Sequence, residues 1–172
     1  MLEPSPLDGD YEGGPQCEGE FVDGVFFLAG TTGGDATRTC TVPADTPLFF
    51  PVVNVVCSEA PTVPTDDGGF TGDPEPYAKC AKQLVRSYIK DGGDSYATLD
   101  GEDLTIRRVG SKPFTWEFPE ESTIFTSVPV GSYDAATYGL WVYVPEGLPE
   151  GEHTVRFGGF FGLDVTYTLM AV

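Results

Sequence analysis

Clustered carboxylates are the first residues in this chain whose types and spacing suggest a chemistry. The string TDDGGFTGD contains Asp66, Asp67 and Asp73 together with glycines that let a loop wrap tightly. Calcium binds to carboxylate and carbonyl oxygens supplied by loops of this kind. We therefore expect residues 66–73 to bind calcium.

A second acidic string, LDGDYEGG, places Asp8, Asp10 and Glu12 at the first, third and fifth positions of an EF-hand-like loop. Gly19 stands where that loop needs its last glutamate, and no flanking helices are evident. This string is the second candidate for calcium, and the alternative is a solvated acidic tail. We expect no zinc, nucleotide or haem.

Catalysis by this chain would have to use carboxylates or the single histidine. The string WEFPEES sets Glu117 and Glu120 beside Trp116, and paired carboxylates next to a sugar-stacking ring can hydrolyse a glycosidic bond. The histidine, His153, lies where a turn leads into a strand, which favours a structural hydrogen bond over general-base work. With no nucleophile elbow or P-loop, we expect no catalytic residue, and these three residues are the alternative.

Aromatic side chains offer a binding chemistry instead. The string GSYDAATYGLWVYV carries Tyr133, Tyr138 and Trp141, which together with Trp116 form a candidate stacking surface for a polysaccharide. Strand alternation supplies the opposing interpretation, since one face of such a strand is simply core.

The four cysteines, Cys17, Cys40, Cys57 and Cys80, form no close pair of the kind that zinc needs. Their even number and wide spacing favour two disulfides in an oxidising compartment. Cys40 and Cys57 flank an extended segment and should not bond each other, because a strand advances about 3.3 Å per residue. Cys17–Cys40 with Cys57–Cys80 is favoured because both loops are local, and the crossed pairing remains open.

The charge distribution limits the partners. The chain of 172 residues has a formal charge of −18, and residues 1–75 hold 14 acidic residues against one basic residue, Arg38. Such a surface repels nucleic acid and anionic lipid. The apolar runs are too short for a membrane span, and residues 1–14 lack the basic and apolar regions of a signal peptide.

These residues must be positioned by short strands, which the 22 glycines and 15 prolines favour. One helix is predicted at about residues 76–90, and an acidic tail, residues 1–16, precedes a single domain over residues 17–172. We expect a strand over residues 20–29 that forms a hairpin with RTCTVP, and a buried strand, PLFFPVVNVVC, with a bulge or an edge at Pro51. Strand-like strings after the helix predict an antiparallel β-sandwich or jelly roll.

The strings GVFFLAGTTGG, RTCTVPADTPLFFPVVNVVCS, YGLWVYVPEGLPEGEHTVRFGG and LDVTYTL resemble those of exported bacterial proteins of unassigned function. The resemblance covers most of the chain from Cys17 onward. It implies an extracytoplasmic location and a β-rich fold, and it assigns no catalytic or binding residue.

We therefore expect a secreted binding or surface-associated module that stacks on an uncharged or cationic polymer, such as an extracellular polysaccharide or an envelope component, with calcium ordering its loops. The alternatives are a small extracellular polysaccharide hydrolase or lyase, and a structural subunit of an envelope layer or filament.

Overall fold

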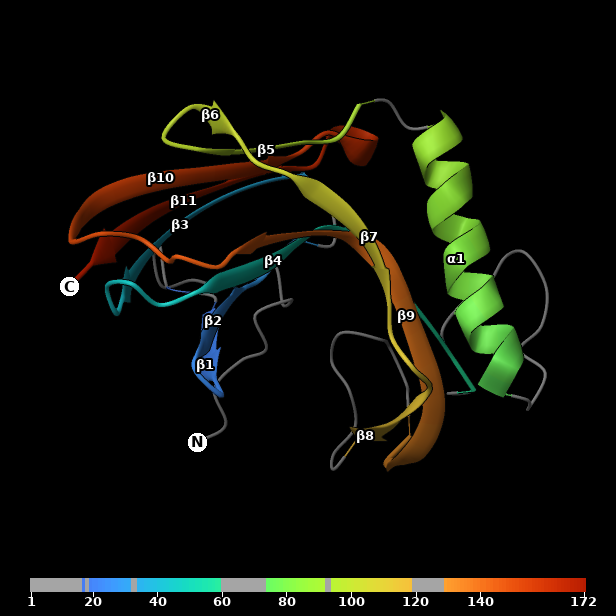
Figure 1. Cartoon of the computed structure of the whole chain (residues 1–172). Helices are drawn as coiled ribbons and strands as arrows, with labels where there is room; N and C mark the ends of the chain where they lie inside the picture. The colour runs from blue at the N-terminus through green and yellow to red at the C-terminus, as the bar shows by residue number, and fades with distance from the viewer. Residues whose placement is uncertain (1–16, 18, 32–33, 60–73, 92–93, 119–128) are drawn as a thin grey trace.

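The computed structural model describes residues 17, 19–31, 34–59, 74–91, 94–118 and 129–172 (Figure 1). Within them, sheet A has the strand order β1-β2-β4-β9-β7, with β8 also paired to β9, and sheet B has the order β3-β11-β10-β5-β6. The strands of sheet A are β1 (Gly19–Val22), β2 (Val25–Leu28), β4 (Leu48–Ser58), β7 (Ile106–Gly110), β8 (Phe114–Phe118) and β9 (Gly131–Val144). Those of sheet B are β3 (Asp35–Val42), β5 (Tyr96–Leu99), β6 (Glu102–Asp103), β10 (Gly151–Gly158) and β11 (Asp164–Ala171).

Two tight hairpins share the dipeptide Asp-Gly. Asp23 and Gly24 have φ values of 49° and 84° between β1 and β2, and Asp100 and Gly101 have φ values of 52° and 86° between β5 and β6. Positive φ at both central residues is the type I′ geometry that matches the twist of paired strands. The single strand predicted over residues 20–29 is therefore wrong, because Asp23–Gly24 folds that segment back on itself.

Both sheets are mixed, which corrects the predicted antiparallel order. Strand β2 runs parallel to β4, and β3 runs parallel to β11. The chain leaves sheet A after β2, forms β3 in sheet B, and returns to sheet A as β4. Because of this excursion β4 lies beside β2 in the same direction, and β3 is not the hairpin partner that the sequence predicted. The result is a sandwich-like arrangement that departs from an all-antiparallel jelly roll.

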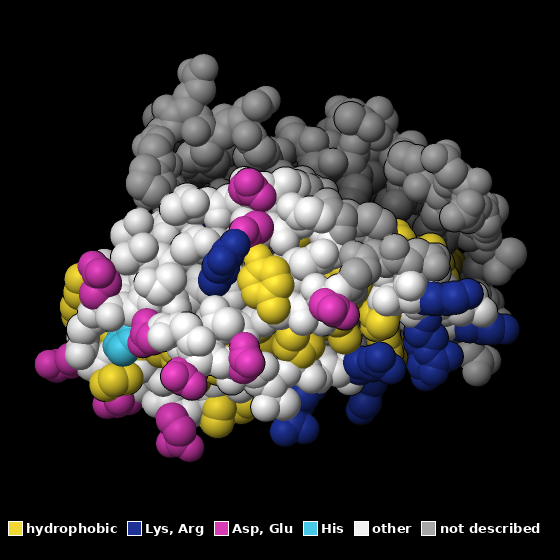
Figure 2. All heavy atoms as spheres, turned by 90° about the horizontal axis from the view of Figure 1, so that it is seen from above, with side chains coloured by type: hydrophobic (Ala, Val, Ile, Leu, Met, Phe, Trp, Pro, Cys, Tyr) yellow, Lys and Arg dark blue, Asp and Glu magenta, His cyan; other side chains and the backbone are white. Residues whose placement is uncertain are grey.

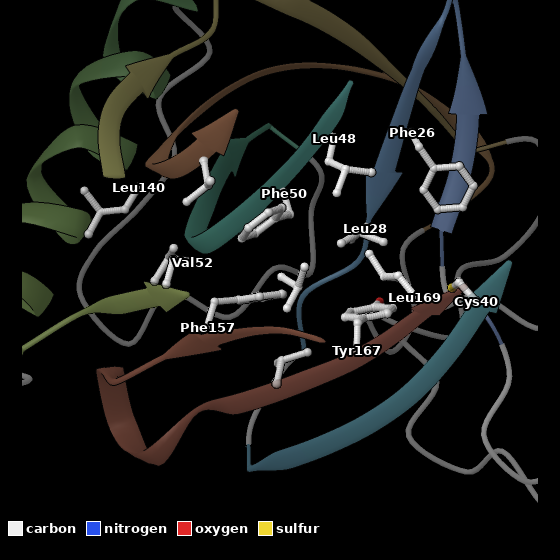
Figure 3. Packing of buried hydrophobic residues seen from close by; sticks show 14 of the residues in the cluster. Phe26, Leu28, Cys40, Leu48, Phe50, Val52, Leu140, Phe157, Tyr167 and Leu169 are labelled. Carbon is white, nitrogen blue, oxygen red and sulfur yellow. The ribbon is translucent and has the colours of Figure 1, made fainter. Parts of the chain in front are cut away.

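The core between the sheets follows from strand alternation (Figure 3). In β4, Leu48 and Phe50 are fully buried whereas Phe49 between them points to the opposite face. The Phe50 ring lies 4.8 Å, centroid to centroid, from that of Phe157 in β10. Each such side chain contributes roughly 1.5–3 kcal/mol by leaving water.

Proline interrupts β4 where the sequence predicts a bulge. The register with β9 shifts between Pro51 and Val53, so both Val52 and Val53 are buried. Proline has no N–H to donate to the ladder, and an extra residue at this point restores the pairing beyond it. The bulge alternative is confirmed, since β4 lies between β2 and β9 and is not an edge strand.

Over the residues that the structure describes there is one α-helix, α1 (Pro74–Asp91), which confirms the predicted helix, and one 3₁₀ turn, η1 (Phe160–Gly162), which precedes β11. Helix α1 packs against the part of sheet A that sheet B does not cover (Figure 1). Tyr77 and Ala81 of α1 form a second buried cluster with Cys57 and Ala136. The same face of sheet A therefore contacts sheet B at one end and α1 at the other.

Two disulfides link these elements, Cys17–Cys40 and Cys57–Cys80, and this is the pairing that the sequence favoured. The second one joins β4 to α1. Two disulfides indicate an oxidising, extracytoplasmic environment. In the described part of the chain, no helix has both the length and the apolar character needed to cross a membrane.

Candidate functional site

The predicted calcium ligands lie outside the described residues. This holds for Asp66, Asp67 and Asp73, and equally for the second candidate set of Asp8, Asp10 and Glu12. Among the residues that are described, no three His, Cys, Asp or Glu side chains are grouped so that they could hold a metal ion.

The alternative catalytic residues are not brought together. Glu117 lies on β8 in sheet A, where its Oε2 accepts a hydrogen bond of 2.6 Å from the hydroxyl of Ser132. His153 lies on β10 in sheet B, and Glu120 is outside the described residues. The structure thus provides no shared site for Glu117 and His153.

The hydrogen-bond partners of His153 favour its protonated form in a structural role. Its Nδ1 lies 2.7 Å from Oδ2 of Asp100, and its Nε2 lies 3.0 Å from the carbonyl oxygen of Pro149. Both partners accept hydrogen bonds, so both bonds form only when the ring carries two protons. A general base needs a free ring nitrogen, and neither nitrogen of His153 is free.

The pKa values of this pair are displaced in opposite directions. The hydrogen bond to Asp100 raises the pKa of His153 above its ordinary 6.5. Partial burial works to raise the pKa of Asp100, but the hydrogen bonds from His153 and from the backbone N–H of Thr154 hold it below its ordinary 3.8. The contribution of the protonated His153 to the folding stability of the protein is fully present below pH 6.5. It is lost as the pH rises through the raised pKa of His153. The stabilisation by the carboxylate is present above pH 3.8 and is lost as the pH falls through the lowered pKa.

Replacing Asp100 by asparagine should lower the titration midpoint of His153 toward 6.5, because the neutral amide stabilises the imidazolium less. The chain has one histidine, so its ring proton signals in a ¹H NMR titration are unambiguous. Asp103→Asn, which changes an exposed carboxylate of β6, is the control and should leave the midpoint unchanged. An unchanged midpoint in Asp100→Asn would show that the pair does not set the charge of His153.

The four aromatic residues that were predicted to bind a ligand lie in three separate places. Trp116 and Tyr133 are cross-strand neighbours on β8 and β9. Trp141 points to the same face of β9 as Tyr133, but it lies eight residues further along the strand. Tyr138 points to the opposite face and packs against both buried clusters. A single platform made of all four rings does not form.

Trp141 instead belongs to an aromatic patch on the outer face of sheet A, which we define as Phe27, Phe49, Trp141 and Tyr143. The ring of Phe49 stacks on Trp141 at 4.8 Å with an interplanar angle of 10°, and it contacts Phe27 and Tyr143 edge to face. Phe27 is 37% exposed and Tyr143 is 50% exposed. Three strands, β2, β4 and β9, thus present an ordered set of rings to solvent.

Glycine at position 139 makes room for the indole of Trp141. A Cβ atom there would lie 2.7 Å from Nε1 of Trp141 and 2.4 Å from the carbonyl oxygen of Val53. Both distances are far below van der Waals contact, so any side chain at position 139 would displace the ring. Because Gly139 has no side chain, the indole of Trp141 can lie against the backbone of β9. Asn54 of β4 is the register partner of Gly139 at this point.

Polar groups border the aromatic patch. Asn54, which is exposed, and Thr137 lie next to Gly139 along the same face, and their side chains hydrogen-bond to each other. Arg107 of β7 is the register partner of Trp141 on the side away from β4. Flat rings bordered by an amide and a guanidinium can stack on an apolar ring face and bond to its polar edge.

Sequence reasoning missed Phe27, Phe49 and Tyr143 as members of this patch. One signal was present, because Phe49 and Phe50 are adjacent in a strand and only one of them can face the core. The other two depend on the pairing of β2, β4 and β9, which lie far apart in the chain.

Comparisons with known proteins add no functional assignment. No protein-family model and no curated protein matches the chain. A solved structure described as "Structure of PbICP-C in complex with falcipain-2" aligns over 92% of this chain and 98% of its own, at 8% identity and a TM-score of 0.20. Similarity at that level carries no argument, so the function must be inferred from the geometry of the chain itself.

Proposed function

We propose that this protein is a secreted binding module whose aromatic patch stacks on the sugar rings of a polysaccharide. The observation that carries the proposal is the patch itself, in which rings from three strands pack on one another while Phe27 and Tyr143 remain exposed. Exposed apolar groups that form a contiguous surface mark binding sites more often than those that lie singly.

The chemistry of the patch fits a sugar polymer. The C–H faces of sugar rings pack on aromatic rings, and their hydroxyl groups need hydrogen-bond partners at the edge. Asn54 and Arg107 supply such partners on either side of Trp141. The two disulfides support a location outside the cytoplasm, where such polymers are found.

Replacing Trp141 by alanine should weaken polysaccharide binding by about thirtyfold or more, since truncating a central aromatic contact costs about 2 kcal/mol. Isothermal titration calorimetry would measure this against a panel of soluble neutral polysaccharides: a β-glucan, a xylan, a mannan and methyl-esterified polygalacturonate. Each titration is run with calcium and again with EDTA, because calcium is the predicted stabiliser of the acidic loops.

Trp116→Ala is the matched control, because it removes the same side chain from β8, at the other end of β9. It should leave binding within about twofold of the parent. If Trp116→Ala abolishes binding and Trp141→Ala does not, the site lies on β8 and the patch is not the binding surface. Absence of binding to every polysaccharide, with and without calcium, would overturn the proposed function.

A further inference from the structure

The basic residues of this acidic protein are concentrated on one side. Of the nine Lys and Arg residues, Arg38 is buried and Arg156 is paired with Asp164. The other seven are exposed and lie on α1, on β7 or in the turn before β8. We call them the cationic face: Lys79, Lys82, Arg86, Lys90, Arg107, Arg108 and Lys112.

Figure 2 shows this separation of charge. Most Lys and Arg side chains in view gather at the end that carries α1, and most Asp and Glu side chains lie toward the other end. Among the carboxylates whose side chains the structure describes, none forms an ion pair with the cationic face. In a chain of net charge −18, these seven cations therefore lack a direct carboxylate partner among the side chains that the structure describes.

On α1 the cations form one continuous row. Lys79, Lys82, Arg86 and Lys90 follow a spacing of three, four and four residues, which places them on one side of the helix. With a rise of 1.5 Å per residue, the row spans about 16 Å. The apolar side of α1 is used for packing on sheet A, so this row faces solvent.

Tyr138 connects that row to β7. The ammonium of Lys82 lies 5.9 Å from the centroid of the Tyr138 ring. The same ring also covers Gly110 of β7, where a Cβ atom would lie 2.9 Å from it. Arg108 projects from the same face of β7 two residues earlier. The helical row and the end of β7 therefore form one surface.

Because side chains alternate between the two faces along β7, the cationic face extends around the edge of sheet A to the aromatic patch. Arg107 and Arg108 are adjacent in β7, so their side chains point to opposite faces. Arg107 is the register partner of Trp141, and β7 is the last strand on that side of sheet A. A polymer that stacks on Trp141 and crosses β7 thus meets Arg107, then Arg108, then the row on α1.

We propose that the ligand of the aromatic patch is a carboxylate-bearing polysaccharide, a polyuronate, whose acid groups contact the cationic face. The inference rests on the proposed function and adds the charge of the substrate to it. The net charge alone predicts an uncharged or cationic polymer. The placement of the cations reverses this expectation, because at physiological ionic strength charges interact over only about 8 Å. The charges near the binding surface, and not the net charge of the chain, therefore determine which polymer is attracted.

The test compares sodium polygalacturonate with its methyl ester, which has the same backbone without the charges, and adds sodium polyphosphate as a polyanion without sugar rings. Calorimetry at about 50 mM salt should show polygalacturonate binding on the order of tenfold more tightly than the ester. At about 500 mM salt the difference should shrink, because screening shortens the range of the charge contacts.

The decisive variant is Lys79→Gln/Lys82→Gln/Arg86→Gln/Lys90→Gln, which removes the row on α1 while keeping residues of similar helix propensity. Exposed charge contacts each change affinity by a factor of roughly 1.5 to 5, so the loss for polygalacturonate should be on the order of tenfold or more. Binding of the ester should be unchanged. A second variant also carries Glu102→Gln, Asp103→Asn, Glu150→Gln and Glu152→Gln, which restores the net charge of the parent at the opposite end of the molecule.

The outcomes separate the two proposals. If the second variant regains polygalacturonate binding, general repulsion caused the loss and the cationic face is not a site. If the ester binds as tightly as the acid and the quadruple variant binds both normally, the aromatic patch is supported and the polyuronate inference fails. If Trp141→Ala leaves polygalacturonate binding intact, or if polyphosphate binds equally well, charge alone is recognised and stacking on the patch is overturned.

Discussion

Replacing Arg38 by methionine should lower the free energy of unfolding by about 2 to 4 kcal/mol, because hydrogen bonds from a charged donor each contribute roughly 1.5 to 3 kcal/mol and the cost of burying the charge offsets part of their sum. Methionine is similar in length and keeps much of the packing, so the loss reports mainly the hydrogen bonds. Chemical denaturation followed by circular dichroism would measure it.

The size of this effect follows from where Arg38 points. It projects from β3 into the sandwich and is only 7% exposed. Its Nη1 lies 2.9 Å from the carbonyl oxygens of both Ala29 and Gly30, just past the end of β2, and 3.1 Å from the hydroxyl of Tyr167. The Tyr167 hydroxyl itself donates to Ala29. One side chain of sheet B thus donates hydrogen bonds to the backbone carbonyl groups at the point where the chain leaves sheet A.

Arg156→Met is the control, since it makes the same substitution on the outer surface of sheet B. Arg156 forms a two-pronged pair with Asp164, whose carboxylate also accepts a hydrogen bond of 2.8 Å from the hydroxyl of Tyr96. The hydrogen bond from Arg156 lowers the pKa of Asp164, but the guanidinium is open to solvent, where such pairs contribute little. Arg156→Met should unfold close to the parent. Equal losses in the two variants would show that burial does not set the contribution of Arg38.

Local patterns in the sequence were sufficient for most elements of the fold. The periodicity around Tyr77 predicted α1, Pro51 predicted a bulge or an edge in β4 and the bulge is present, and the local spacing of cysteines favoured the observed disulfides. Each depends on residues near each other in the chain. The Asp23–Gly24 turn was equally local but was missed, although Asp-Gly is among the strongest hairpin signals.

Features that depend on contacts between distant segments could not be predicted in the same way. The parallel pairing of β2 with β4 and of β3 with β11 requires knowledge of which sheet each strand joins. Pairing among the strands of sheet A likewise places Phe49 beside Trp141, Phe27 beside Phe49, and Arg107 on the other side of Trp141. Sequence reasoning identified Trp141 as a candidate and could not identify its neighbours, so the aromatic patch emerged only from the structure.

Removing the disulfide between Cys57 and Cys80, by replacing both with alanine, should cost about 3 kcal/mol of stability in the chain-entropy account of a loop of this size. The loss should be concentrated in α1. The first half of the helix is buried only in a small cluster, in which Tyr77 and Ala81 contact Cys57 and Ala136, whereas Val85 further along belongs to the main core. Hydrogen exchange measured by mass spectrometry should show faster exchange across residues 74–91.

Cys17→Ala/Cys40→Ala is a matched control, because both disulfides join residues 23 apart in the sequence. Loop entropy alone therefore predicts the same loss for the two variants. Cys40 lies in the core between the sheets and Cys17 is exposed near the start of β1, so this change should speed exchange in β1 and β3 and leave α1 protected. If α1 keeps its protection without the Cys57–Cys80 bond, packing alone holds the helix, and the row of cations on it does not depend on that disulfide.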